Sequence, residues 1–327
     1  MFNPITIVID AFIEELVQKY VDIYGPNEID IQILATNART ALEVIASSDA
    51  PYHDIDHTMM VTMVGQEILT GKMYMEGDIR PSDWTHFIVA LLNHDIGYVR
   101  GICRADRSGR YAINKHMDTI APPSGTTDAF LTPYHVDRGQ IYVRERFEHD
   151  EHIDSETVCR FIERTRFPVP NESDHQDSTD LPGLLRAADL IGQLADPQYM
   201  TKISNLYHEF RETDQLAKMG YSSVSDVREG YPQFFWNVVS PFIADGIRFL
   251  RRTQEGQAWV ANLYANVFTE EHDAPAYGPE RRGDPDRRNE AADLFKIREL
   301  TENDGRKQIR RAADINEMSY AKKKTAD

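Results

Sequence analysis

The sequence predicts an all-α protein built as a multi-helix bundle, and three observations support that prediction. Apolar residues recur at steps of three and four through most of the chain, as Ile5, Ile9 and Phe12 do near its start, which is typical of amphipathic helices. No run of alternating apolar and polar residues indicates a strand. His94 and Asp95 directly follow an apolar segment, so the bundle has to compensate ionisable groups in its core.

Length and composition are those of a globular protein. Of the 327 residues, 41% are hydrophobic and 27% are charged, which is enough apolar material for one large or two ordinary domains. The net charge of -17 argues against a nucleic-acid or membrane-surface binder. Two cysteines, Cys103 and Cys159, do not make a disulfide framework. Because no apolar stretch could span a bilayer and no signal peptide is evident, we expect a cytoplasmic protein.

The first half of the chain contains clear helix boundaries. Gly25 and Pro26 end the first amphipathic segment. Pro81, followed by Ser82 and Asp83, is typical of a helix start. The expected helices are residues 5–24, residues 29–47, a third that begins after Pro51 and carries His53 and His57, and a fourth that begins at Pro81 and ends at Gly97.

The second half predicts further helices after an irregular stretch, residues 98–128, that is rich in Arg, Gly and Pro. The helices are expected at residues 134–166, 181–192, 199–220 and 231–269, with an acidic loop over residues 171–180. One helical domain would then span residues 1–270. Residues 271–288 are expected to form a linker, and residues 289–327 a charged helix with a frayed end.

Candidate metal ligands lie in these helices. Six apolar residues run directly into His94 and Asp95, and Asp189 lies inside a second apolar helix. His53 and His57, four residues apart on a predicted helix, would project from one face. Either an ion pair or a divalent ion can compensate such groups in a core. Mixed nitrogen and oxygen ligands suit one or two ions of Zn, Mn, Mg or Fe. The candidate ligands are His57, His94, Asp95 and Asp189.

This order of residues resembles the HD-domain metal-dependent phosphohydrolase superfamily, over roughly residues 45–250. The segment with His53 and His57 is similar to a helix of class I cyclic-nucleotide phosphodiesterases, which implies that His53 is the general acid and His57 a metal ligand. The resemblance also implies an HD-type helical fold with a metal site in its core. The further ligands that it implies are His94, Asp95 and Asp189.

Other segments extend the resemblance. The segment around His135 is similar to the His-His segment of the family, which implies a place beside the first ion or in the coordination of a second. The aromatic stretch 231–241 resembles the segment whose Phe packs on the substrate base, so Phe234 and the neighbouring Gln233 are candidate substrate-binding residues. Tyr98 stands where the cyclic-nucleotide enzymes have a further His.

The function that the resemblance implies is metal-dependent hydrolysis of a phosphate mono- or diester of a nucleotide or a related small metabolite. The ion would activate water, with Asp95 bridging two ions if two are bound, and His53 would protonate the leaving oxygen. Arg100 and Arg104, in a basic stretch of an acidic chain, are candidates for holding the phosphate. Neither nucleic acid nor membrane is an expected partner, whereas a homo-oligomer is possible.

Two alternative functions stay open. Some HD-fold proteins with this ligand order use two iron ions and extra histidines to activate oxygen, and His116 and His135 are candidates for those extra ligands. The other alternative is a non-catalytic nucleotide-binding sensor, since the charged C-terminal helix and the acidic surface suit a partner. Two irons with oxygen-dependent turnover would identify the oxygenase, and nucleotide binding without turnover would identify the sensor.

Overall fold

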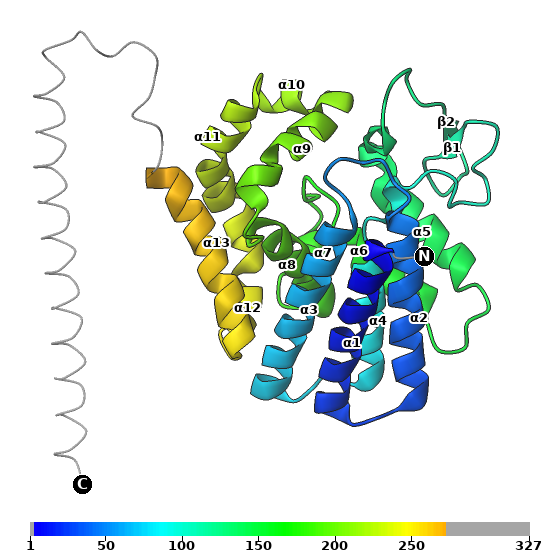
Figure 1. The fold of residues 1–327 in the computed structure, drawn as a ribbon, viewed down its shortest axis with the longest axis vertical. Coiled ribbons are helices and arrows are strands. Elements are labelled where there is room, and N and C mark those ends of the chain that lie inside the picture. The colour runs from blue at the N-terminus through cyan, green and yellow to red at the C-terminus, as the bar shows by residue number, and fades with distance from the viewer. Residues whose placement is uncertain (1–2, 273–327) are drawn as a thin grey trace, which may run out of the picture. The chain divides into compact units, whose positions relative to one another are not determined.

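Helices carry nearly all the regular structure of residues 3–272, which are the residues that this computed structural model describes (Figure 1). Their bounds are α1 Pro4–Tyr24, α2 Glu28–Ile45, α3 Ile55–Glu76, α4 Pro81–Asn93, α5 His135–Arg146, α6 Ser155–Glu163, α7 Ser173–Gln176, α8 Leu181–Leu194, α9 Tyr199–Glu212, α10 Gln215–Met219, α11 Val224–Phe234, α12 Ser240–Leu250 and α13 Gln254–His272, with the tighter or wider helical turns η1 Ile96–Tyr98, η2 Asp128–Tyr134 and η3 Phe235–Val239. Within these residues the only sheet is an antiparallel hairpin of β1 (Tyr111–Ala112) and β2 (Thr119–Ile120). The prediction of an all-α multi-helix bundle is therefore confirmed.

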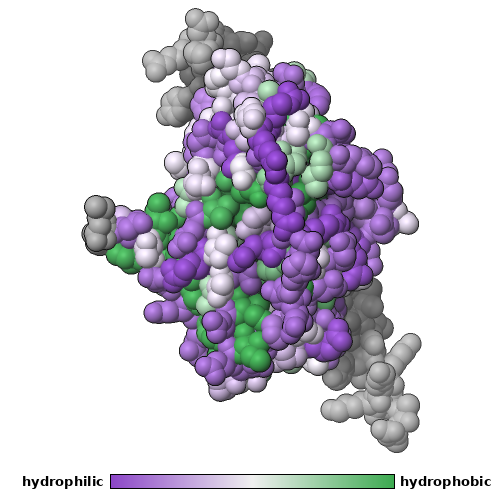
Figure 2. Space-filling view, turned by 90° about the vertical axis from the view of Figure 1, so that its right-hand side faces the viewer, coloured by the Kyte–Doolittle hydropathy of each residue, from purple (hydrophilic) through white to green (hydrophobic). Residues whose placement is uncertain are grey.

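The described residues cover the predicted helical domain except for its first two positions. The predicted linker, residues 271–288, lies outside the described residues from residue 273 on, as does the whole charged helix predicted for residues 289–327. No helix in the described part of the chain has the length and apolar character needed to cross a membrane. Figure 2 shows a face on which hydrophilic residues predominate between separate hydrophobic patches, in keeping with the high content of charged residues.

Side-chain caps decide where the first three helices begin. The amide oxygen of Asn3 accepts the N–H of Ile5 at the start of α1, and Asn27 caps α2 in the same manner. The carboxylate of Asp54 accepts the N–H of His57 at 3.0 Å, which satisfies a donor that the first helical turn leaves free. Because α3 begins only after this cap, His53 precedes the helix. The prediction that His53 and His57 share one helical face is wrong.

Three long predicted helices are divided in the structure. The segment 199–220 contains α9 and α10. The segment 134–166 contains α5 and α6, because Asp154 starts a new helix by accepting the N–H of Glu156. The segment 231–269 contains the end of α11, the π-helical turn η3, α12 and α13. Thr253 starts α13, since its hydroxyl oxygen accepts the N–H of Gly256. Periodicity alone does not distinguish one long helix from successive helices with the same buried side.

The centre of the bundle is formed by α3, α4 and α8, which pack against one another. Residues 87–92 of α4 are 0% exposed, and burying large apolar side chains contributes roughly 1.5–3 kcal/mol each. A side chain on Gly65 of α3 would collide with Leu91. Gly192 of α8 leaves similar room for Val61. Figure 1 shows α1, α2, α3 and α4 running alongside one another, so the ends of these helices are held rigidly.

Gly97 sets the distance between η1 and α5, which predicts a large effect of a small substitution. A Cβ on Gly97 would collide with the backbone carbonyl of His135 and would lie 2.8 Å from the backbone nitrogen of Gly139. Neither atom can move without shifting α5. We expect Gly97→Ala to lower the free energy of unfolding by about 1–3 kcal/mol, as overpacking does in well-packed cores, in a urea titration followed by circular dichroism.

Gly139→Ala is the matched control, because Gly139 lies on the other side of the same contact. A Cβ there meets its nearest atom, the backbone oxygen of Asn93, at 3.5 Å, which is ordinary contact. Alanine is favoured over glycine inside a helix by roughly 0.5–1 kcal/mol, so this variant should be as stable as the parent or more stable. Equal stability of the two variants would contradict the importance of the contact.

Candidate metal centre

Four side chains from different elements converge at the buried end of α4. His57 comes from the first turn of α3, His94 and Asp95 follow α4, and Asp189 projects from α8. The Nε2 atoms of His57 and His94 lie 3.3 Å apart. Oδ2 of Asp95 lies 3.2 Å from the first of these nitrogens and 3.0 Å from the second. We call His57, His94, Asp95 and Asp189 the His/Asp cluster.

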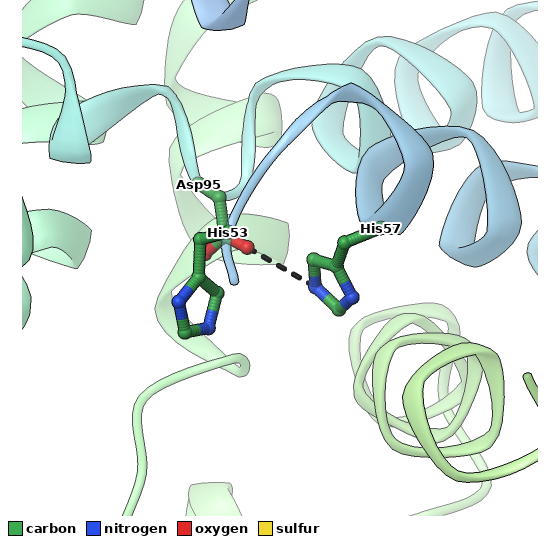
Figure 3. Close-up of side chains that lie close together, drawn as sticks. All are labelled: His53, His57 and Asp95. Carbon is green, nitrogen blue, oxygen red and sulfur yellow. Dashed lines mark ion pairs between the residues drawn. The ribbon is translucent and has the colours of Figure 1, made fainter. Parts of the chain in front are cut away.

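The fourth member closes the cluster from α8. Oδ1 of Asp189 lies 3.6 Å from Nε2 of His57 and 3.5 Å from Nε2 of His94. The two histidines are 5% and 1% exposed, so the group is buried among the helices that form the centre of the bundle. One ligand atom each from His57, His94 and Asp189 lie within 4.8 Å of one another, and the same holds for His53, His57 and Asp95. Figure 3 shows this second group, with the ion pair between His57 and Asp95 dashed.

The chemistry of the donor atoms fits a divalent cation. Nδ1 of His94 lies 2.6 Å from the carbonyl oxygen of Leu91, so Nδ1 carries the proton and Nε2 presents a lone pair. While both imidazoles are neutral with Nε2 unprotonated, the buried Oδ2 of Asp95 has no hydrogen-bond donor within residues 3–272, and its nearest polar neighbours are the two Nε2 atoms at 3.2 Å and 3.0 Å. Leaving a buried carboxylate oxygen unsatisfied costs free energy, and a cation between these atoms would remove that cost. The nitrogen and oxygen donors match those of Zn, Fe or Mn sites.

Protons compete with a cation for the same atoms. Burial lowers the pKa of His94, but the charges of Asp95 and Asp189 outweigh burial and raise the pKa well above its ordinary value. Burial raises the pKa of Asp95, whereas the neighbouring imidazolium groups of His94 and His53 hold that pKa well below its usual range. His94 and Asp95 therefore form an imidazolium–carboxylate pair in the metal-free protein, and a metal ion that binds Nε2 of His94 would release a proton.

Glu209 orients His53, and the sequence reasoning missed it. Glu209 lies on α9 and is 0% exposed. Its Oε1 accepts the backbone N–H groups of Tyr52 at 2.6 Å and of His53 at 3.1 Å, and its Oε2 lies 2.5 Å from Nδ1 of His53. An ionised carboxylate only accepts, so Nδ1 carries the proton. The spacing did carry a signal of its burial, because Glu209 lies on the same side of α9 as the buried Ile203 and Leu206. It carried no signal of the bond to His53.

Removing the charge of Glu209 should lower the pKa of His53. Burial lowers this pKa, but the charges of Glu209 and Asp95 outweigh burial and raise it to about 9. Because that value lies above the unfolded value of 6.5, protonation of His53 stabilises the fold fully below pH 6.5, and the stabilisation is lost as the pH rises to about 9. We expect Glu209→Gln to lower the pKa of His53 and to weaken this pH dependence, as measured by NMR titration of chelator-treated protein.

Glu212→Gln is the control for that titration. Glu212 lies less than one turn further along α9 and accepts hydrogen bonds from the backbone and hydroxyl of Thr127 at 2.9 Å and 3.0 Å. The Glu212→Gln variant removes the same negative charge from α9, but at a residue that bonds Thr127 and not His53. An unchanged His53 titration in Glu209→Gln, or an equal shift in both variants, would show that Glu209 does not act through its direct bond.

Tyr98 lies between two imidazole rings. It stacks on His53 with ring centroids 4.4 Å apart and on His135 with centroids 4.7 Å apart. Nε2 of His135 lies 3.7 Å from Oδ1 of Asp95, and Nδ1 of His135 lies 2.6 Å from the carbonyl oxygen of Thr132. His135 therefore adjoins the cluster on the second oxygen of Asp95, and Tyr98 fills the space between the two outer histidines.

A cavity of about 560 Å³ opens from the cluster. His53, Asp95, His135 and Asp189 line it on one side, and Phe234 and Gln233, the predicted substrate-binding residues, lie along its wall. Its size is that of a pocket for a small-molecule ligand.

The two predicted phosphate-binding arginines are placed elsewhere. Arg100 pairs with Asp49 and Asp128, and Arg104 pairs with Glu148 while its side chain is 64% exposed. Neither arginine is among the residues that line the cavity. Both guanidinium groups thus already have carboxylate partners outside the candidate site.

The fold and the site define an all-α protein whose buried His/Asp groups can hold a metal ion. The model of the Npun_R2479-like family matches residues 2–273, and the chain belongs to that family. No curated protein matches the chain.

Proposed function

We propose that the protein is an HD-type, metal-dependent phosphohydrolase that cleaves a phosphate mono- or diester of a nucleotide or a related small metabolite. The observation that supports this most is the His/Asp cluster, in which Oδ2 of Asp95 faces Nε2 of both His57 and His94. His53, whose Nδ1 is held by Glu209, lies beside it at the wall of a ligand-sized cavity. The resemblance of the motif order to the HD-domain superfamily points to the same reaction.

The cluster would supply a charged, buried site for the reacting phosphate. A divalent ion bound there would act as a Lewis acid on phosphoryl oxygens and would lower the pKa of water. Asp95 and Asp189 would balance positive charge in the site. Because α3, α4 and α8 are packed centrally in the bundle, these groups need little rearrangement when substrate binds.

His53 is the proposed general acid. Its Nδ1–H is held by Glu209, so Nε2 is the nitrogen that can give its proton to the leaving oxygen. A pKa raised to about 9 keeps His53 protonated at neutral pH. Phe234 and Gln233 line the same cavity, and in this proposal they would contact the leaving part of the substrate.

Metal content and substrate screening test the proposal. Purified protein should contain a divalent metal by inductively coupled plasma mass spectrometry. When loaded with Mn, Mg, Zn or Fe, it should hydrolyse at least one member of a panel of nucleoside monophosphates, linear diesters and cyclic nucleotides, and a chelator should stop that turnover. An intact metal site without turnover of any phosphate ester would count against hydrolysis. His53→Asn should keep the metal and lose turnover, and unchanged turnover would remove only the acid role.

The oxygenase alternative has weaker support in the structure. It requires further imidazoles, and His135 does adjoin Asp95 at 3.7 Å. His116, however, is exposed beside the β1–β2 hairpin and belongs to neither of the metal-binding groups found among the described residues. Two irons per chain with oxygen-dependent turnover would favour this alternative. A nucleotide that binds without being consumed would favour a sensor.

A further inference from the structure

Arg186 is a buried cation in the wall of the cavity. It lies on α8 one turn before Asp189, is 2% exposed, and lines the same cavity as His53 and Asp189. Its guanidinium stacks on the ring of Phe242, with a distance of 4.1 Å from Cζ to the ring centroid. A buried charge needs an ionised partner or a full set of hydrogen bonds.

Arg186 has neither a carboxylate partner nor a full set of hydrogen bonds within residues 3–272. One terminal nitrogen donates to the carbonyl of His175 at 2.6 Å, and the other donates to the carbonyl of Asp177 at 3.1 Å. A guanidinium has five N–H groups, and Nε is buried without an acceptor in the described part of the chain. Burial and the neighbouring charge of Arg164 lower the pKa of Arg186 to about 10, and the opposing charges of Asp180 and Asp177, which form no ion pair with it, do not offset them.

Other arginines of the protein show what a compensated guanidinium looks like. Arg138 is 0% exposed, and it donates to three backbone carbonyls and to both oxygens of Asp106. Arg166, which also lines the cavity, pairs with Asp137 and Glu163. Arg186 differs from both because no carboxylate of the described residues forms an ion pair with it. An anion would supply the partner that Arg186 lacks.

The guanidinium of Arg186 points away from the His/Asp cluster. Its acceptors, the carbonyls of His175 and Asp177, belong to the segment that precedes α8, whereas Asp189 lies one turn further along the helix. Long helical side chains generally point back toward the N-terminus of their helix. An anion at Arg186 would therefore occupy a different part of the cavity from a phosphate at the cluster. Aromatic residues such as Tyr231 and Phe234 line the same cavity.

We propose that Arg186 binds an acidic group, a carboxylate or a phosphate, that the substrate carries in addition to the phosphate at the His/Asp cluster. This inference rests on the proposed function and narrows the substrate class to esters with a second acidic group on an apolar or aromatic body. A charge-assisted hydrogen bond from a guanidinium to an anion is stronger than one between neutral groups. The second acid should therefore raise the affinity of a ligand by about tenfold or more.

Phosphonates test the inference without turnover, because hydrolysis does not cleave their carbon–phosphorus bond. The probes are benzylphosphonate, 4-carboxybenzylphosphonate and p-xylylenebisphosphonate, together with the corresponding biphenyl series, which places the second acid further away. Isothermal titration calorimetry of the metal-loaded protein should show about tenfold or tighter binding when the second acid is present at one of the two spacings. The carboxylate and bisphosphonate arms show which acid is preferred. Equal affinities with and without the second acid at both spacings would overturn the inference.

Two variants locate the effect. Arg186→Gln should remove the preference for the second acid, whereas Arg166→Gln, which takes the same charge from the same cavity, should keep most of it. A preference that survives in Arg186→Gln would overturn the inference. If Arg186→Gln does not fold, the comparison of probes on the parent protein still decides. If phosphate esters are turned over but a second acidic group does not tighten binding, only this inference is overturned. If a second acidic group tightens binding but no ester is turned over, only the proposed function is overturned.

Discussion

Replacing His94 with Ala is expected to abolish metal binding and to lower phosphate-ester turnover by about 10³-fold or more. Nε2 of His94 presents its lone pair within 3.0 Å of Asp95 and 3.3 Å of His57. Its loss leaves the two carboxylates of the cluster with one imidazole, so a cation would have fewer ligands and a looser site. The measurements are metal content by mass spectrometry and turnover of the best substrate from the screen.

His86→Ala is the matched control, because His86 lies on the same helix, α4, and is not part of the His/Asp cluster. Its ring contacts the carbonyl of Ser82 and accepts the N–H of Asp154, so its replacement tests a general loss of a histidine contact. We expect this variant to keep its metal and its turnover. Full metal content in His94→Ala would contradict the proposed ligand role even if turnover were lost.

Local signals explain why the helices of the first half could be predicted closely. Gly25 and Pro26 end α1 where expected, and Pro81 begins α4. Each of these signals acts within a few residues of the boundary that it sets. The observed start of α3 differs from the predicted one because the carboxylate of Asp54 accepts the N–H of His57 and so caps the helix. A cap inside a mixed polar segment is harder to predict than a helix start marked by proline.

The His/Asp cluster was predictable for a related reason. His94, Asp95 and Asp189 lie in or next to helices so apolar that burial follows from their neighbours in sequence. Glu209 and His53 are 156 residues apart in the sequence, so no local pattern around either residue predicts the bond between them. Arg186 lies in the same apolar helix as Asp189. That it lacks a carboxylate partner can be recognised only when the ion pairs of the folded chain are known.

Arg138→Met is expected to lower the free energy of unfolding by about 3–5 kcal/mol, because it leaves the carboxylate of Asp106 buried without its cation. Both residues have fully buried side chains, and Nη2 of Arg138 lies 2.9 Å from Oδ2 of Asp106. The same guanidinium bonds the carbonyls of Gly97 at 2.7 Å and Val99 at 2.8 Å. Gly97 and Val99 lie within four residues of Asp95, so the variant should also bind metal more weakly. Denaturant titration and metal titration measure the two effects.

A double variant separates the unpaired charge from the lost hydrogen bonds. Adding Asp106→Asn removes the buried charge that Arg138→Met leaves behind, so the double variant should be more stable than Arg138→Met alone. Arg104→Met, at an exposed arginine, should change stability by no more than about 0.5 kcal/mol. If the double variant were the less stable of the two, the carbonyl bonds rather than the ion pair would dominate. If the double variant is the more stable, a buried guanidinium of this protein depends on its carboxylate, as Arg138 does on Asp106. Arg186, also buried, has no such ion pair within residues 3–272.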